Sequence, residues 1–326
     1  MAAKDTKVSV VICAFTMERF KDTCEAVQSL IEQTLKPQEI IVAIDHNDEL
    51  YRALRDALPA TVRVIKNESA PGVSVTRNTG ILAASGDVIA CMDDDARASN
   101  DWLEKIVKPL ESGKVSVVGG KCELFWKGGE RPAWFAEELD WIVGGTYKGH
   151  PEEPTEVRNI SSCSMALPRE TLEAAGCFDE RIGSVNGERR GGEEAVFCLN
   201  IKNSLPEKLI WYEPRAVVLH KVHVRRAKIG YIIKRSYQEG VSKALLENLV
   251  RSNRSLRVES SYLRYLMKKS IPGRLATIYR KTSFLQLWAI TLSVCATLAG
   301  YIVQKIKRLF RSGGMQNRAL AEGQIE

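Results

Sequence analysis

Three consecutive aspartates, Asp93, Asp94 and Asp95, follow the apolar run 88–92. The run predicts a buried strand that opens into a loop. Adjacent carboxylates repel one another, so a fold accommodates them where they are solvated or where a cation lies between them. At the carboxyl end of a central strand, a divalent metal carrying a phosphorylated ligand fits this pattern. An acidic turn that caps a helix starting near Asn100 fits it equally well.

The elements that must position these carboxylates alternate between strand and helix along the N-terminal half. The apolar patterns predict strands at 7–15, 39–44 and 62–65 and helices at 17–35 and between Gly72 and Ser85. This alternation predicts a mostly parallel sheet covered on both faces. Because parallel strands end at the same edge, we expect Asp45 and Asp93 to face one cleft.

Composition narrows the class of protein. The 326 residues carry a net charge of +7, and the basic residues cluster after Arg215, which indicates an anionic surface partner. No nucleic-acid-binding motif is visible, so nucleic acid is not an expected partner. The eight cysteines form no Cys-x-x-Cys pair, which argues against structural zinc and suits a reducing compartment. The N-terminal residues lack a secretory signal pattern.

The segment 282–304 contains no charged residue, has Trp288 and Tyr301 near its ends, and is flanked by basic residues. It is long enough to cross a bilayer, as a single span or a shallow re-entrant helix, and a buried helix of a soluble domain is the alternative. Upstream, 255–274 has the pattern of a basic amphipathic helix. Such a helix could lie on an anionic leaflet or pack on the domain.

Several segments in order resemble glycosyltransferase family 2: 8–15, 72–80, 92–95, 162–170, 175–181, 192–197 and 212–220. The resemblance covers about residues 7–222. It implies an α/β fold of the GT-A type, the nucleotide-diphospho-sugar transferase fold, with a mostly parallel central sheet. We expect a catalytic domain at 1–222 and a helical, basic, membrane-proximal region at 223–281. A transmembrane or re-entrant helix at 282–304 and a basic polar tail at 305–326 complete the expected C-terminal extension.

The resemblance also implies roles for individual residues. Asp45 would contact the nucleoside and Arg77 the donor phosphates. The expected nucleotide-sugar-binding residues are Ala14, Asp45, Arg77, Asp93 and Arg190. Arg190 lies in the glycine-rich loop 183–192, which could close over the donor. Arg189 and Arg190 could then pair with a phosphate or with a carboxylate on the sugar, or the segment could simply be a solvated basic loop.

A metal site is implied at the Asp-x-Asp motif. Asp95 would bind Mn²⁺ or Mg²⁺, Asp93 would hold the ribose or support the metal, and His220 would complete the coordination. An ordinary hydrogen-bonded histidine at a strand end is the other interpretation of His220.

The expected catalytic base departs from the family pattern. Family members usually have Glu-Asp at this point, with the aspartate as base, whereas this chain has Glu193-Glu194. We expect Glu194 to be the base, with Glu193 taking part, in an inverting displacement. Both glutamates could instead simply begin a helix.

The basic C-terminal extension predicts a lipid-linked acceptor, dolichyl or polyprenyl phosphate, on the cell membrane with the catalytic domain facing the cytoplasm. The segment 231–237 would run from the cleft toward the bilayer. Similar enzymes extend lipid-linked glycans for N-glycosylation, and a UDP-sugar donor is favoured, including UDP-glucuronate. Surface-polysaccharide synthesis and a non-catalytic nucleotide-sugar sensor remain alternatives. A dehydrogenase is excluded because no Gly-x-Gly-x-x-Gly turn follows the first strand.

Overall fold

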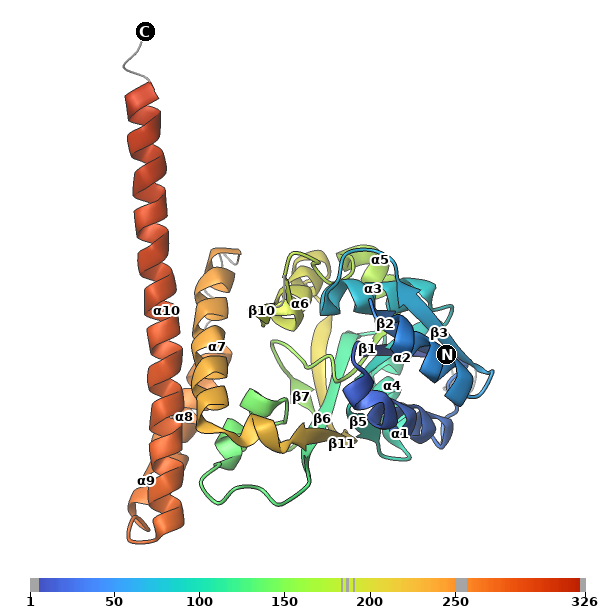
Figure 1. Cartoon of the computed structure of the whole chain (residues 1–326), viewed down its shortest axis with the longest axis horizontal. Helices are drawn as coiled ribbons and strands as arrows, with labels where there is room; N and C mark the ends of the chain where they lie inside the picture. The colour runs from blue at the N-terminus through green and yellow to red at the C-terminus, as the bar shows by residue number, and fades with distance from the viewer. Residues whose placement is uncertain (1–5, 183, 186–187, 190, 250–256, 323–326) are drawn as a thin grey trace.

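A single mixed sheet organises the N-terminal two thirds of the chain, with strand order β3-β2-β1-β4-β8-β6-β11-β5 and β7 paired to β11 (Figure 1). The computed structural model describes residues 6–182, 184–185, 188–189, 191–249 and 257–322. The sheet strands are β1 Val8–Ala14, β2 Glu39–Asp45, β3 Val62–Asn67, β4 Val88–Asp93, β5 Ala96–Ala98, β6 Val115–Lys127, β7 Thr155–Glu156, β8 Ser164–Pro168 and β11 Leu209–His223. A separate two-stranded ribbon pairs β9 Ser184–Val185 with β10 Glu188–Arg189.

The strands β3, β2, β1 and β4 are parallel, and β6 is parallel to β11. The strand β8 runs antiparallel between β4 and β6, so the two parallel groups point the same way. The expected α/β fold with a mostly parallel sheet is therefore confirmed.

Helices connect and cover the strands. They are α1 Phe20–Ile31, α2 Asp48–Ala57, α3 Val73–Ala83, α4 Trp102–Val107, α5 Arg169–Ala175, α6 Glu193–Ser204, α7 Ile229–Leu249, α8 Arg257–Tyr265, α9 Ile271–Leu275 and α10 Lys281–Glu322. The helix predicted at 17–35 begins as the 3₁₀ turn η1 Met17–Arg19 and is α-helical only to Ile31. Other short turns are η2 Lys108–Ser112, η3 Glu137–Val143, η4 Val224–Ala227 and the π-helical η5 Leu266–Ser270.

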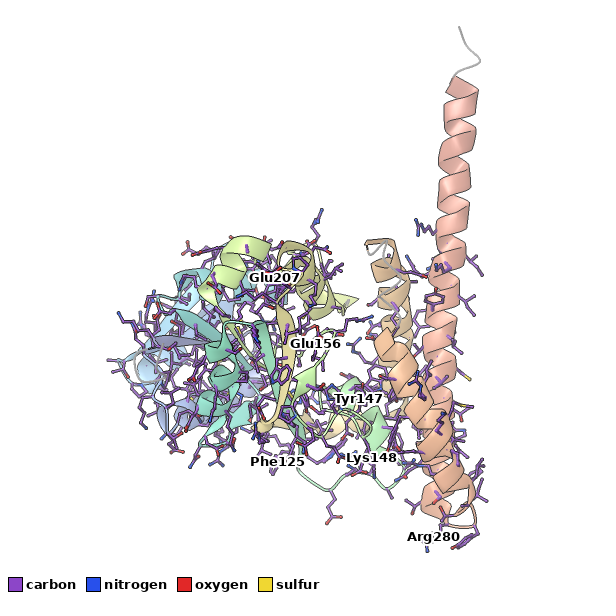
Figure 2. All side chains as sticks on the ribbon, turned by 180° about the vertical axis from the view of Figure 1, so that it is seen from behind. Phe125, Tyr147, Lys148, Glu156, Glu207 and Arg280 are labelled. Carbon is purple, nitrogen blue, oxygen red and sulfur yellow. The ribbon has the colours of Figure 1, made fainter. Side chains whose placement is uncertain are left out.

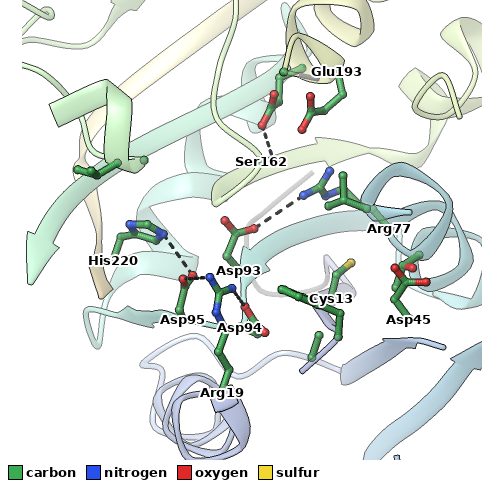
Figure 3. A pocket seen from close by; sticks show the side chains of 18 of the residues that line it. Cys13, Arg19, Asp45, Arg77, Asp93, Asp94, Asp95, Ser162, Glu193 and His220 are labelled. Carbon is green, nitrogen blue, oxygen red and sulfur yellow. Dashed lines mark hydrogen bonds and ion pairs between the residues drawn. The ribbon is translucent and has the colours of Figure 1, made fainter. Parts of the chain in front are cut away.

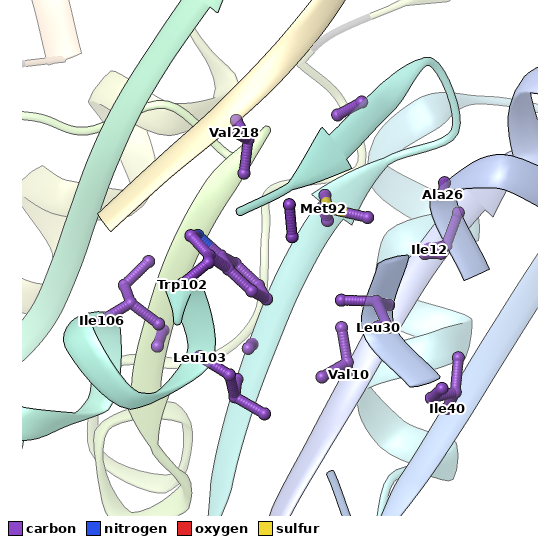
Figure 4. Close-up of a cluster of buried hydrophobic side chains, with 14 of the residues drawn as sticks. Val10, Ile12, Ala26, Leu30, Ile40, Met92, Trp102, Leu103, Ile106 and Val218 are labelled. Atoms are coloured by element: carbon purple, nitrogen blue, oxygen red, sulfur yellow. The ribbon is translucent and has the colours of Figure 1, made fainter. Parts of the chain in front are cut away.

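Each face of the sheet has its own apolar core, because alternate residues of a strand point to opposite faces. On one face, Val10 and Ile12 of β1 pack with Leu30 of α1 and Trp102 of α4 (Figure 4). On the other face, Val11 packs in a cluster with residues of α3, α5 and α6. Because both faces are buried, the carboxyl ends of the strands are held in fixed positions relative to one another.

A third cluster joins the C-terminal helices to the sheet domain. Phe135 and the turn η3 pack with Ile232 of α7, Leu266 of η5 and Ile290 of α10. Arg274 adds a two-pronged ion pair to the buried Glu138, at 2.8 and 2.7 Å. Within the described residues, one helix, at Lys281–Arg308, is long and apolar enough to cross a membrane by length and composition.

Candidate active site

A cavity of about 600 Å³ opens at the carboxyl ends of β1, β2 and β4 (Figure 3). Every predicted site residue that the structure describes lines it: Ala14, Asp45, Arg77, Asp93, Asp95, Glu193, Glu194 and His220. The remaining one, Arg190, lies outside the described residues. Residues as far apart in the chain as Ala14 and His220 thus meet in one space.

The aspartates after β4 are clamped by a residue that sequence reasoning missed. Arg19, from the turn η1, contacts Asp94 at 2.5 Å and Asp95 at 2.8 Å. Burial raises the pKa of the Asp94 carboxyl to about 7, because the charged form loses its hydration there. The sequence offered one signal for Arg19, namely its position shortly after the carboxyl end of β1.

Asp95 has further basic neighbours. The Nε2 atom of His220 lies 3.2 Å from one carboxylate oxygen, and Arg226 lies 3.7 Å from the other. Burial alone would raise the pKa of Asp95, but His220, Arg19 and Arg226 together hold it below the ordinary value. Asp95 is therefore a carboxylate kept charged inside the protein.

The donor set around these carboxylates fits a divalent cation. Apart from its ion pair with Nε2 of His220, the buried Oδ1 of Asp95 has no hydrogen-bond partner among the described residues, and Nδ1 of His220 has none. Ligand atoms of Asp93, Cys163 and His220 lie within 4.8 Å of one another. A hydrogen bond with Cys122, followed by burial, raises the pKa of Cys163, so its thiol is a poorer ligand than the two aspartates.

Asp45 lies at the opposite side of the cavity, at the end of β2. Asn67 donates a hydrogen bond to its Oδ1 at 3.3 Å, and the backbone N–H of Gly72 donates to its Oδ2 at 3.1 Å. Gly72 has a φ of 153°, a conformation that favours glycine, which lets the chain turn into α3 beside the carboxylate. The loop between β3 and α3 thus fixes the orientation of Asp45.

Arg77, on α3, is buried between Asp93 and the ring of Phe178. Its Nη2 lies 3.8 Å from Asp93 Oδ1, and the guanidinium carbon lies 5.0 Å from the ring centroid. Its Nη1 has no hydrogen-bond partner in the part of the chain that the structure describes. A buried guanidinium with an unused N–H donor can bind an anionic group in the cavity.

Glu193 and Glu194 begin α6 and also line the cavity. Ser162 donates a hydrogen bond to Oε1 of Glu194 at 2.8 Å, which orients that carboxylate. Burial, and then the neighbouring charge of Glu194, raise the pKa of Glu193 to about 7. The pair therefore holds one oriented carboxylate beside one that binds a proton near neutral pH.

This raised pKa predicts a pH-dependent effect of Glu193→Gln on stability. An acid whose pKa rises on folding binds more protons folded than unfolded, so it lowers stability as pH rises from about 4.5 to 7. The isosteric amide removes that penalty, which is roughly 3 kcal/mol for a shift of this size. We expect the melting temperature of the variant to exceed that of wild type at pH 8 and to equal it at pH 4. Thermal denaturation scans at the two pH values measure the difference. A constant difference across this range would contradict the burial of a proton-binding Glu193.

Another wall of the cavity comes from segments outside the parallel strands. Trp141 of η3 and Tyr231 and Arg235 of α7 line the cavity. The Nη1 atom of Arg235 has no hydrogen-bond partner among the described residues, and a Cβ at Gly191 would lie 2.9 Å from its Nη2. The guanidinium therefore reaches the loop that begins the α6 helix, next to the glutamates.

Comparison with known proteins decides the family. The sequence profile of glycosyl transferase family 2 matches residues 9–176. The chain belongs to glycosyl transferase family 2. A glucosyl-dolichyl phosphate glucuronosyltransferase of Haloferax volcanii is 31% identical over 302 residues, which cover 91% of this chain and 95% of the relative. The protein is thus a glycosyltransferase, as its sequence predicted.

Two solved structures share the fold. The mannosyltransferase PcManGT from Pyrobaculum calidifontis, in complex with GDP-Man and Mn²⁺, has a TM-score of 0.57 at 16% identity. The alignment covers 96% of this chain and 81% of that one. GalNAc-T7 with UDP, GalNAc and Mn²⁺ has a TM-score of 0.52 at 15% identity, covering 82% and 57%. The expected GT-A fold is confirmed.

Proposed function

We propose that this glycosyltransferase moves one sugar, with inversion, from a nucleotide diphospho-sugar to the sugar of a dolichyl- or polyprenyl-phosphate acceptor. The observation that carries the proposal is the single cavity that unites the aspartates, Arg77 and the glutamate pair. The Haloferax relative, named for glucuronosyl transfer to glucosyl-dolichyl phosphate, supports a lipid-linked acceptor and transfer of a glucuronosyl group, for which we propose UDP-glucuronate as the donor. The alternative function is membrane-bound synthesis of a surface polysaccharide, which would use the same transfer chemistry.

The donor occupies the side of the cavity that Asp45, Arg77 and Asp93 form. Asp45, fixed by two hydrogen bonds, accepts from the nucleoside, and Ala14 borders the same space. The unused Nη1 of Arg77 donates to a diphosphate oxygen. Asp95, Asp93 and His220 would hold Mn²⁺ or Mg²⁺, which when bound would neutralise charge on the departing diphosphate. Both fold neighbours were solved with Mn²⁺, in agreement with a divalent cation.

Glu194 accepts the proton of the acceptor hydroxyl while that oxygen forms a bond to the anomeric carbon. The bond from the anomeric carbon to the diphosphate oxygen breaks, and its electron pair leaves with the nucleotide. Ser162 keeps the carboxylate oriented at 2.8 Å, as a positioned general base requires. Attack from the face opposite the nucleotide turns an α-linked donor into a β-linked product.

Arg235 marks the acceptor side of the cavity. It comes from α7, which packs on the apolar helix α10. Its Nη1 lies 3.6 Å from Glu239 but makes no hydrogen bond within the described residues, and its guanidinium lies beside the loop that leads to Glu193. An acceptor of the proposed kind carries a phosphate one sugar away from the reacting hydroxyl. We assign Arg235 to that phosphate.

The substitution Arg235→Gln is expected to raise the KM for the lipid acceptor by about tenfold, because it removes a charge-assisted hydrogen bond. The KM for the nucleotide sugar should not change. Initial rates with each substrate varied in turn measure the two constants. The matched control is Lys234→Gln, an exposed neighbour on the same helix. A rise in the donor KM instead would place the sugar carboxylate, and not the acceptor phosphate, against Arg235.

The function is tested by supplying labelled nucleotide sugars, one at a time, to membranes that contain the protein and lipid extract. A labelled lipid that a chelator abolishes is the expected product, with UDP-glucuronate the first donor to try. Binding of a nucleotide sugar without any lipid product would contradict the lipid acceptor and favour a nucleotide-sugar sensor. The catalytic part, 1–222, is proposed to face the cytoplasm at the cell membrane, with 223–281 beside the bilayer.

A further inference from the structure

The helix α10 exposes one continuous apolar stripe. Its large exposed side chains are Phe284, Trp288, Leu298, Ile302 and Ile306, which lie four residues apart except for the interval between Trp288 and Leu298. The uncharged Thr291 and Cys295 fill the same stripe. At 1.5 Å per residue the stripe is roughly 33 Å long, and its spacing keeps it on a single face of the helix.

The opposite face of the same stretch is bound to the rest of the chain from end to end. Gln286 donates a hydrogen bond to the Ala133 carbonyl at 3.0 Å, and the hydroxyls of Ser236 and Ser293 are 2.9 Å apart. A Cβ at Gly240 would overlap the carbonyl oxygen of Thr297, so α7 and α10 touch backbone to backbone. Figures 1 and 2 show α7 and the sheet domain together on one side of α10. Figure 2 labels Arg280, which directly precedes the first residue of α10.

This packing is incompatible with α10 standing across a bilayer. A perpendicular α10 would draw α7 into the hydrocarbon along with Lys234, Arg235, Glu239 and Lys243, and charged groups at that depth are costly. Glu239 lies 3.6 Å from Arg235 and 3.5 Å from Lys243, and the three charged side chains are partly exposed to solvent. The sheet domain, held through Gln286, would have to enter as well.

The surface next to the stripe has the composition of a membrane interface. The segment 263–279 exposes Leu263, Met267, Leu275, Ile278 and Tyr279. Exposed basic residues alternate with them: Arg264, Lys268, Lys269, Arg280 and Lys281. Apolar groups enter the acyl boundary and basic groups meet anionic headgroups in helices that lie on a leaflet.

We propose that α10 lies in the plane of an anionic leaflet, with its exposed stripe buried at the interface and both ends of the chain on one side of the membrane. The catalytic cavity then stands beside the bilayer surface, and α7 connects the two. The proposal concerns attachment and does not depend on which sugar is transferred.

The topology is tested with the full chain carrying one epitope tag at each terminus, in sealed membrane vesicles treated with protease from outside. Both tags should be digested together, or protected together, in vesicles of either sidedness. Digestion of one tag with protection of the other would show a spanning helix and overturn the proposal. Transfer activity is not the readout, so this result is separate from the fate of the proposed function.

The contact itself is tested by sedimentation with vesicles of equimolar phosphatidylcholine and phosphatidylglycerol. Leu298→Glu should reduce the bound fraction of the purified full chain about tenfold or more. The control is Leu82→Glu on α3, because Leu82 is 72% exposed and lies outside the stripe, whereas Leu298 is 54% exposed. Equal binding of wild type and Leu298→Glu, with unchanged melting temperatures, would overturn the membrane contact.

Discussion

Glu194→Gln is expected to lower the turnover number by about 10²- to 10⁴-fold, the range that loss of a positioned general base produces. The amide keeps the shape of the side chain but cannot accept the hydroxyl proton. Because Ser162 can still donate to the amide oxygen, the fold and the donor site should be preserved. Single-turnover transfer assays measure the rate, and titration with nucleotide sugar measures donor affinity.

The neighbouring glutamate is the control for this assignment. Glu193→Gln changes a residue of the same type, on the same helix turn, whose Oε2 has no hydrogen-bond partner among the described residues. It should lose far less activity than Glu194→Gln at pH 8. The reverse order would assign the base to Glu193, whose pKa near 7 also suits proton transfer.

The sheet was predictable because its strands are nearly uninterrupted apolar runs. The runs before Phe15 and before Asp93 have the composition of strands buried on both faces, and the structure places them next to each other as β1 and β4. Helix ends were less predictable. The segment 17–35 has apolar spacing throughout, but a 3₁₀ turn at Met17 and the end of α1 at Ile31 divide it.

The carboxylates of the site were visible in the sequence, as were Arg77 and His220, whereas two of the cations that hold the carboxylates, Arg19 and Arg226, were not. Arg19 is one of 47 basic residues in the chain, and only its position shortly after the first strand separates it from the others. Arg226 follows the long strand β11, and only the sheet order brings it 3.7 Å from Asp95. Such pairings depend on the tertiary arrangement, so the sequence shows the charges that need partners but not the partners.

The contrast between two adjacent aspartates follows from those partners. Asp95→Asn should reduce transfer about 10³-fold or more, since it removes both an oxygen ligand and the charge that faces Arg19, His220 and Arg226. Donor titrations with and without chelator check the cause, because donor binding by the variant should no longer respond to the chelator.

Asp94→Asn is the matched control, because Arg19 contacts both carboxylates. With a pKa of about 7, Asp94 is already half neutral at neutral pH, so an amide there changes less charge than it does at Asp95. Activity within about tenfold of wild type is expected. Since removing one partner of a buried ion pair also destabilises a fold, melting temperatures are measured for both variants. Equal losses of transfer in the two would mean that the position of Arg19, and not the ligand oxygen of Asp95, controls the reaction.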